Sequence, residues 1–437
     1  MTFLRNHRLL TLAGLALTWR LMFIIIFPGP NYFEGISGSY LEVAQNILQG
    51  KGVVTYVDVA PLSAPERALT YETFIDRPLG YPFLILLPSL VTSSPIGIQI
   101  LHALLAAWSV IILYLLGKEL VAERTAWRAA MVYALWPLSA RFEVAILPDA
   151  VMPLFLLSTL WLLLKGIKSE RGLKWYGAAG IVCGIGMTMR PDILLLPFFL
   201  AVGLFFLKNS PNRSKGALAL LAGVVFVVGL HTARNYDATG GKVLPLGLGN
   251  GISMWEGISQ FGDTLGTVYG DEKMARREGY LSWAYPDGIE RDRRRFKEAV
   301  DIILANPVWY AGIMVKRLPV LLTPDWIMTR KFAPSLKEFL DASPRNTVSA
   351  YLASYPIPAL LRAILLLLQY ASLMLAMHAL WMHRRNRLLW LPALVIFYYI
   401  VIHIPTNTEA RYFYPVLPLV LFLASLGWQS VKQPVMD

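Results

Sequence analysis

Apolar stretches of about twenty residues recur along this 437-residue chain, and each is long enough to cross about 30 Å of hydrocarbon as a helix. Charged residues make up only 16% of the sequence, against about 25% in soluble proteins. The single cysteine, Cys183, excludes an internal disulfide bond. We therefore predict an all-α polytopic membrane protein with about ten transmembrane helices. The spans are expected at residues 9–27, 96–117, 127–145, 148–166, 175–190, 191–208, 216–233, 357–381, 388–404 and 412–429.

The distribution of basic residues predicts how these spans are oriented. The chain carries a net charge of +12, and its lysines and arginines cluster before the first span and after the second, fourth, sixth and eighth. All of these clusters lie on the side where the chain begins, which the positive-inside rule identifies as the cytoplasm. Both ends are therefore expected inside, in an inner (cytoplasmic) membrane, with the first span retained as a signal anchor. Basic cytoplasmic loops account for the net charge without nucleic acid as a partner.

This topology leaves two long loops outside the cytoplasm, at residues 28–95 and 234–356, within a single integral membrane domain that covers residues 1–437. The first loop contains apolar residues at helical spacing over 40–48, which predicts a short amphipathic helix. In the second loop the segment 309–322 is apolar but carries two basic residues in its middle. We expect this segment to lie in the membrane interface, because a span there would reverse the pattern of basic loops.

Carboxylates, arginines and tyrosines gather at the outer ends of the spans, at one depth in the membrane. Arginine binds phosphate as a planar fork, and a carboxylate there can act as a base or a metal ligand. Such a group suits a lipid-linked anionic substrate whose site faces outside the cytoplasm. The sequence shows no dedicated metal cluster and identifies no cofactor, although a divalent cation stays an option. The residues concerned are Glu34, Tyr40, Glu143, Asp149, Arg190, Asp192, His231, Arg234, Glu409, Arg411 and Tyr412.

Some of these residues also have structural explanations. Asp149 follows a proline and could cap the fourth span. Arg190 and Arg411 could extend towards lipid headgroups, and Asp192 could be a local partner of Arg190. These readings do not exclude a role in binding, because a capping carboxylate or a paired arginine can also contact a substrate.

Three polar residues, His231 among them, lie within or near the spans. His231 and His403 are interpreted as structural. Arg20 is embedded in the first span, where an arginine is costly and normally has a partner. An ion pair with another helix and a contact with substrate are both compatible with its position.

Short motifs follow one another in a fixed order along the chain. They are Arg77–Pro82 (RPLGYP), Asp149 at the start of the fourth span, Arg190-Pro191-Asp192 at a hairpin tip, Arg234-Asn235-Tyr236 after the seventh span, and Glu409–Pro418 (EARYFYPVLP). Each motif alone is weak. In order, spacing and sidedness, the set resembles the bacterial GT-C glycosyltransferases over nearly the whole chain, specifically the group akin to protein O-mannosyltransferases and lipid A aminoarabinose transferases.

This resemblance implies a GT-C fold and an enzyme that moves a sugar from a polyprenyl-phosphate donor to an acceptor on the outer face, with inversion at the anomeric carbon. The acceptor is a glycan, a lipid or a protein. The resemblance implies that substrate-binding residues are Tyr40, Arg77, Arg190, Asp192, Arg234, Glu409, Arg411 and Tyr412.

One position departs from the pattern of this family. The family's base is an aspartate four residues before the tyrosine that corresponds to Tyr40, and that position is Ile36 here. The nearest acid is Glu34, on a segment flanked by glycines. We expect Glu34 to act as the base and Asp149 to orient the acceptor or a metal. The alternatives are that Asp149 is the base or that the protein is inactive.

Two other functions compete with the glycosyltransferase. A transporter or flippase of a lipid-linked sugar would more often show repeats and polar residues near the bilayer midplane. This chain instead keeps its polar groups at one interface and carries a long outer loop, which favours chemistry at the membrane surface. A non-catalytic relative that binds the lipid carrier is the third hypothesis, and Ile36 is the residue that supports it.

Overall fold

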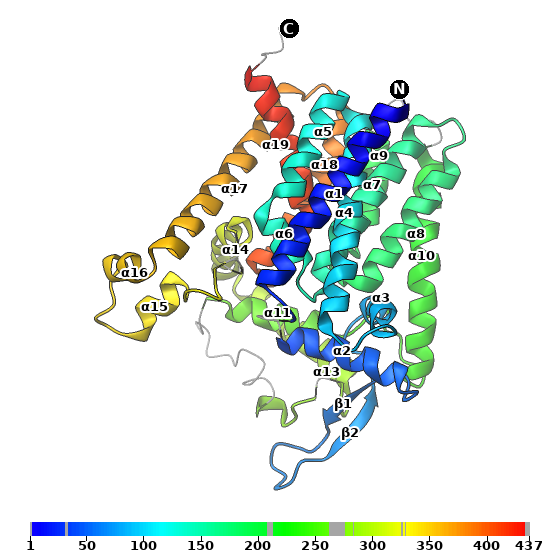
Figure 1. The fold of residues 1–437 in the computed structure, drawn as a ribbon. Coiled ribbons are helices and arrows are strands. Elements are labelled where there is room, and N and C mark those ends of the chain that lie inside the picture. Colours follow the sequence, from blue (N-terminus) through cyan, green and yellow to red (C-terminus); the bar gives the residue numbers. More distant parts are fainter. Residues whose placement is uncertain are drawn as a thin grey trace.

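The computed structural model describes residues 2–30, 34–207, 213–261, 276–282, 284–324, 327 and 329–432. Within these residues the chain forms a bundle of helices and one two-stranded sheet (Figure 1). The bundle contains α1 (Thr2–Ile26), α4 (Pro95–Leu120), α5 (Glu123–Leu135), α7 (Met152–Lys168), α8 (Leu173–Met189), α9 (Leu196–Phe206), α10 (Arg213–Ala238), α17 (Pro356–Met382), α18 (Trp390–His403) and α19 (Leu417–Lys432). Short helices between them are α6 (Pro137–Glu143), η2 (Pro148–Val151), η3 (Pro191–Ile193), η5 (Arg387–Leu389) and η6 (Ala410–Val416).

The two long loops form the remaining elements. The first holds α2 (Glu34–Leu48), β1 (Val54–Asp58), β2 (Leu69–Thr73) and α3 (Gly80–Ser89), and the second holds α11 (Asn250–Ser259), α13 (Gly288–Ala305), α14 (Pro307–Leu322), α15 (Leu336–Ala342) and α16 (Val348–Ser354). The amphipathic helix predicted in the first loop is found as α2. The antiparallel hairpin was not predicted, although its valines, threonines and tyrosines favour strands.

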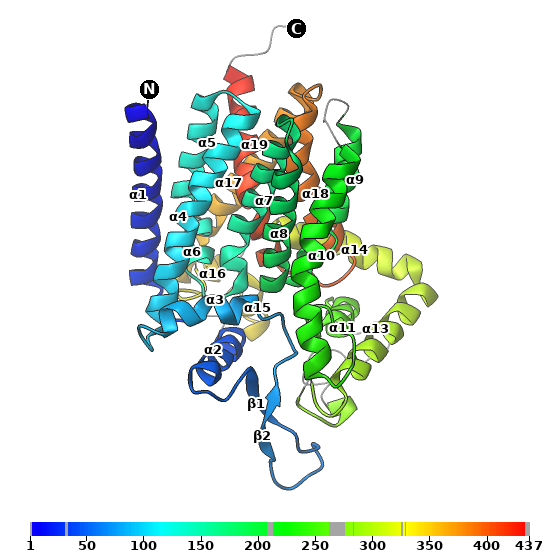
Figure 2. The same cartoon turned by 90° about the vertical axis from the view of Figure 1, so that its right-hand side faces the viewer.

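Both views of the molecule place the loop elements at one end of the bundle. The helices α2, α3, α11 and α13 and the hairpin lie at the end opposite to the start of α1 and the end of α19 (Figures 1 and 2). We call the end with these loop elements the loop end of the bundle. The opposite end holds the start of α1 and the end of α19. That the loop end faces away from the cytoplasm stays a prediction.

The apolar helices confirm a multi-pass membrane protein, whereas the count of ten spans stays a prediction. Among the described residues, six helices are long and apolar enough to cross a membrane, or seven if the pair α13 and α14, bent by 106°, counts as one. The predicted span 127–145 is interrupted where α5 ends and α6 begins at Pro137. The predicted spans 175–190, 191–208 and 388–404 correspond to α8, α9 and α18, whose 17, 11 and 14 residues fall short of the about twenty that usually cross a membrane.

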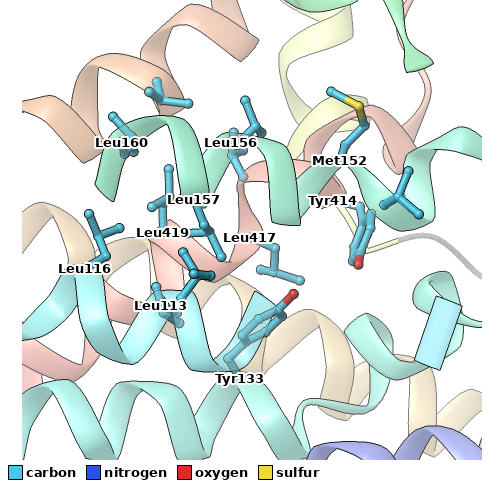
Figure 3. Packing of buried hydrophobic residues seen from close by; sticks show 14 of the residues in the cluster. Leu113, Leu116, Tyr133, Met152, Leu156, Leu157, Leu160, Tyr414, Leu417 and Leu419 are labelled. Carbon is cyan, nitrogen blue, oxygen red and sulfur yellow. The ribbon is translucent and has the colours of Figure 1, made fainter. Parts of the chain in front are cut away.

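The core of the bundle lies between α4, α5, α7 and α19. Figure 3 shows leucines of α4, α7 and α19 interlocking beside Tyr133 and Tyr414. Small residues let some backbones approach closely. A Cβ on Gly180 of α8 would overlap the carbonyl oxygen of Leu220 on α10, and one on Gly427 of α19 would overlap that of Leu375 on α17. Close packing through glycine is a usual way for membrane helices to associate, and it sets the position of α8, whose end carries Arg190.

Candidate active site

Arg190 lies at the centre of the polar groups at the loop end. Pro191 follows it, and the extended backbone that a proline imposes on the preceding residue ends α8 there. The guanidinium of Arg190 donates from Nη1 to Asp149 and, over 2.7 Å, from Nε to Oδ2 of Asp192. All three side chains are nearly buried, with 12% of Arg190, 3% of Asp149 and 9% of Asp192 exposed. Two carboxylates therefore share one arginine, and the trio keeps an excess negative charge when both are ionised.

The last outer loop adds a second arginine and carboxylate to this group. Arg411 lies 2.8 and 2.9 Å from the two carboxylate oxygens of Glu409, and the Tyr412 hydroxyl donates to the same carboxylate over 2.9 Å. The guanidinium carbon of Arg190 lies 4.7 Å from the centroid of the Tyr412 ring. Tyr412 thus connects the pair of the last loop with Arg190. Glu409, at 42% exposure, marks the side of the cluster that is open to solvent.

The first outer loop reaches the same place through α2. The buried hydroxyl of Ser37 donates to the carbonyl of Ile146 over 2.7 Å, which ties α2 to the segment directly before Asp149. Arg77 stacks on the ring of Tyr40, with 5.2 Å between guanidinium carbon and ring centroid. Burial raises the pKa of Tyr40, while Arg77 lowers it in part, and the charges of Asp149 and Arg190 also act on this hydroxyl. Through the bond of Ser37, α2 with Tyr40 and the stacked Arg77 is tied to the segment that leads into Asp149.

The large outer loop contacts the segment between α18 and η6 through hydrogen bonds of α11 and α14. Arg317 of α14 is fully buried and donates to the carbonyls of Ile404, over 2.6 Å, and of Gly257. Asn407 donates to Glu256 of α11 over 2.7 Å. The segment 309–322, predicted to lie in the interface, thus has a structural role, because Arg317, one of its two basic residues, holds the segment that leads to Glu409.

Three of the singled-out residues have different surroundings. Arg234 donates to the carbonyl of Phe74 over 3.0 Å and to the side chain of Asn235 over 2.9 Å, so these contacts hold the end of the first loop. Its role in substrate binding stays a prediction. Glu143 is fully buried and paired with Arg20. Ile36, at the position of the family's base, packs against the hydrophobic core.

Glu34, the expected base, is the first residue of α2, and its side chain lies outside the described part of the structure. Its position on α2 places its backbone in the helix that carries Tyr40. Whether Glu34 takes the proton stays a prediction.

Sequence reasoning missed some polar residues in this region. Asp76 directly precedes Arg77, and its Oδ1 is buried without a hydrogen-bond partner. Burial raises the pKa of Asp76 to about 6. Its place next to the RPLGYP motif was the signal that could have identified it. His403 was interpreted as structural, but it lies 3.5 Å from Asp192, and only the tertiary structure brings α18 and η3 together.

A metal site receives no support from the described residues, in which no group of three or more histidine, cysteine, aspartate or glutamate side chains could hold an ion. Asp149 and Asp192 are both engaged by Arg190, and Glu409 is engaged by Arg411. Their arrangement suits the binding and orientation of a polar substrate next to arginines that can contact phosphate.

Comparisons with known proteins agree with this geometry. Residues 76–232 match the family described as "Dolichyl-phosphate-mannose-protein mannosyltransferase", a segment that includes Arg77, Asp149 and the Arg190-Pro191-Asp192 motif. YkcB of Bacillus subtilis (strain 168), assigned as a mannosyltransferase, is 35% identical over 132 residues, which cover 28% of this chain and 18% of YkcB.

The fold is similar to that of a solved oligosaccharyltransferase. The crystal structure of the Archaeoglobus fulgidus oligosaccharyltransferase in the apo form superposes with a TM-score of 0.51 at 14% identity, over 98% of this chain and 50% of that chain. This chain thus spans about half of that enzyme and a fifth of YkcB. The resemblance predicted from the sequence is confirmed: the chain has the fold of the GT-C superfamily of glycosyltransferases, and its residues 76–232 match a mannosyltransferase family.

Proposed function

We propose that this protein transfers a sugar from a polyprenyl-phosphate donor to an acceptor at the outer face of the membrane, with inversion at the anomeric carbon. The observation that supports it best is that Arg190, paired with Asp149, and Arg411 both lie against the ring of Tyr412 at the loop end of an apolar bundle, with Arg77 stacked on Tyr40 of α2. A lipid-linked phosphate enters such a site with its prenyl chain among the apolar helices and its charge near the arginines. The matched family is described by a dolichyl-phosphate mannose donor, which is the same class of donor.

The reaction assigns each group a task. The acceptor hydroxyl attacks the anomeric carbon while the bond between that carbon and the phosphate oxygen breaks. Polyprenyl phosphate leaves with the electron pair, and the acceptor proton passes to a carboxylate. Arginines stabilise the phosphate, whose charge grows as it leaves. Asp149 is already held by Arg190, which suits it to orienting the acceptor, and Glu34 is then the base.

The proposal is tested with purified protein and undecaprenyl- or dolichyl-phosphate mannose, followed by separation of the labelled sugar from the lipid. Asp149→Asn should lower turnover by at least about a hundredfold, which is the usual rate loss when a group that contacts the reacting hydroxyl is removed. Asp301→Asn is the matched control, because Asp301 is an exposed aspartate of α13. Equal turnover in both variants would contradict the site.

The same preparation separates the two alternative functions. Movement of intact donor across a proteoliposome membrane, without loss of its sugar, would identify a flippase. Binding of donor without hydrolysis or transfer, over a panel of sugars, would identify a non-catalytic lipid-binding relative. Either result would replace the transferase proposal.

A further inference from the structure

Asp192 lies between Arg190 and His403, a histidine to which the sequence assigned no role in the reaction. The Oδ2 of Asp192 accepts a hydrogen bond from Nε of Arg190 over 2.7 Å, and the same oxygen lies 3.5 Å from Nε2 of His403. The two contacts come from different helices: Arg190 follows the last residue of α8, and His403 is the last residue of α18. Asp192 is thus the link between the arginine of the site and the histidine behind it.

Some polar atoms around Asp192 are buried and have no hydrogen-bond partner. These atoms are Oδ1 of Asp192 and the hydroxyl of Tyr399, whereas Nε2 of His403 faces Oδ2 of Asp192 at 3.5 Å. His403 is 5% exposed and Tyr399 is fully buried, so bulk water does not satisfy them. A buried unpaired polar group costs about 1–3 kcal/mol, and such groups persist where they serve another purpose.

The ring of His403 is held in place on its other side. It stacks on Tyr412, with 4.7 Å between ring centroids and 28° between planes, and it also packs against Tyr399. Its backbone carbonyl accepts from the hydroxyl of Thr408 over 2.8 Å. His403 therefore occupies one position and presents one nitrogen towards Asp192.

We propose that His403 is a positioning residue that acts through Asp192 to keep part of the Arg190 guanidinium available for the donor phosphate. The proposal rests on the function proposed above. Asp192 now bonds Arg190 through one oxygen only, while its other oxygen is unpartnered. Arginine and carboxylate prefer a bidentate fork, in which two N–H groups are used. The contact of His403 with Oδ2 keeps the carboxylate of Asp192 from turning into the bidentate arrangement.

Removal of the histidine therefore has a defined consequence. The carboxylate of Asp192 turns so that both oxygens bind Arg190, and a second N–H group is lost to the phosphate. Binding of the donor weakens, whereas the chemistry of a bound donor is little affected. The loss of one hydrogen bond to a charged group predicts about a tenfold weaker donor affinity.

The test is a double-mutant cycle of His403→Ala and Asp192→Asn, with donor KM, kcat and the Kd for undecaprenyl phosphate as readouts. His403→Ala should raise KM and Kd about tenfold with kcat changed less than about threefold. His403→Gln should restore most of the affinity, because its amide can still reach Asp192. In the Asp192→Asn background, His403→Ala should have little further effect, because an amide does not form the bidentate pair with Arg190.

The controls separate positioning from stability. His383→Ala removes a histidine at the opposite end of the bundle, one whose Nε2 lies 3.0 Å from the hydroxyl of Ser430, and it should leave the Kd unchanged. If His403→Ala does not fold, the cycle is run with His403→Gln and His403→Leu. Equal losses in both Asp192 backgrounds, or a lower kcat with unchanged KM and Kd, would overturn the proposal. Because the Kd is measured without a sugar, failure of transfer in the wild-type protein would refute the proposed function and leave this test valid.

Discussion

The buried ion pair between Arg20 and Glu143 makes a prediction that can be worked out from the structure. Both side chains are 0% exposed, and Oε2 of Glu143 lies 2.6 Å from Nη2 and 2.7 Å from Nε of Arg20. Arg20 also donates to the carbonyls of Ala16 and Ala134, and the hydroxyl of Tyr133 donates to Glu143. The pair joins α1 to α6 inside the bundle. Of the two contacts that the sequence left open for Arg20, the structure shows the ion pair with another helix.

Glu143→Gln removes one charge and leaves the guanidinium buried without a counter-ion. Breaking a buried pair in this way costs about 3–5 kcal/mol, whereas replacing both partners by apolar residues is often neutral or stabilising. The variant should therefore lose about two to four orders of magnitude in its ratio of folded to unfolded molecules. The double variant Arg20→Met/Glu143→Leu should recover most of this loss, because no charge remains buried.

Unfolding is followed in detergent micelles by the fluorescence of the 13 tryptophans. Glu290→Gln is the control, since Glu290 pairs with Arg293 on the surface of α13 with 53% and 56% of their side chains exposed. Its loss should be within about 1 kcal/mol. The reasoning is refuted if Glu143→Gln behaves like this control, or if the double variant is less stable than Glu143→Gln. Turnover per folded molecule should change little, because Glu143 is fully buried and paired with Arg20 rather than with the Arg190 group.

Three further predictions concern the loop end. Burial raises the pKa of Asp76 from 3.8 to about 6, so the folded state keeps a proton that the unfolded state loses as the pH rises through this interval. Stability should therefore fall from pH 4 to pH 6 by up to about 3 kcal/mol, and Asp76→Asn should remove this part of the pH dependence in thermal unfolding; an unchanged pH profile would be evidence against it. Arg411→Lys loses the planar fork and should raise the donor KM, and Arg411→Ala should raise it further. An unchanged donor KM in both variants would mean that Arg411 only pairs with Glu409. With the native Cys183 buried and silent, Ser349→Cys should react with an impermeant thiol reagent on intact cells and Ser169→Cys should not, and the opposite result would reverse the topology.

The arrangement of the Arg190 group was only partly accessible to sequence reasoning. The pairing of Arg190 with Asp192 could be predicted because a proline between them makes a tight turn. The contacts of Arg190 with Asp149 and Tyr412 join residues 41 and 222 positions away, and no local pattern encodes such distances. They depend on how α8, η2 and η6 pack.

The sequence by itself determined the class of fold, because apolar runs and sided basic clusters follow from the bilayer's exclusion of charge and polar backbone. The order of short motifs was also enough to indicate the GT-C superfamily. Only the tertiary structure decided the partners of the charged residues. In a membrane helix the lipid-facing and core-facing sides are equally apolar, so hydropathy does not show which face carries a partner. That is why Arg20 could be recognised as needing a counter-ion, whereas Glu143 as that ion and His403 behind Asp192 emerged from helix packing alone.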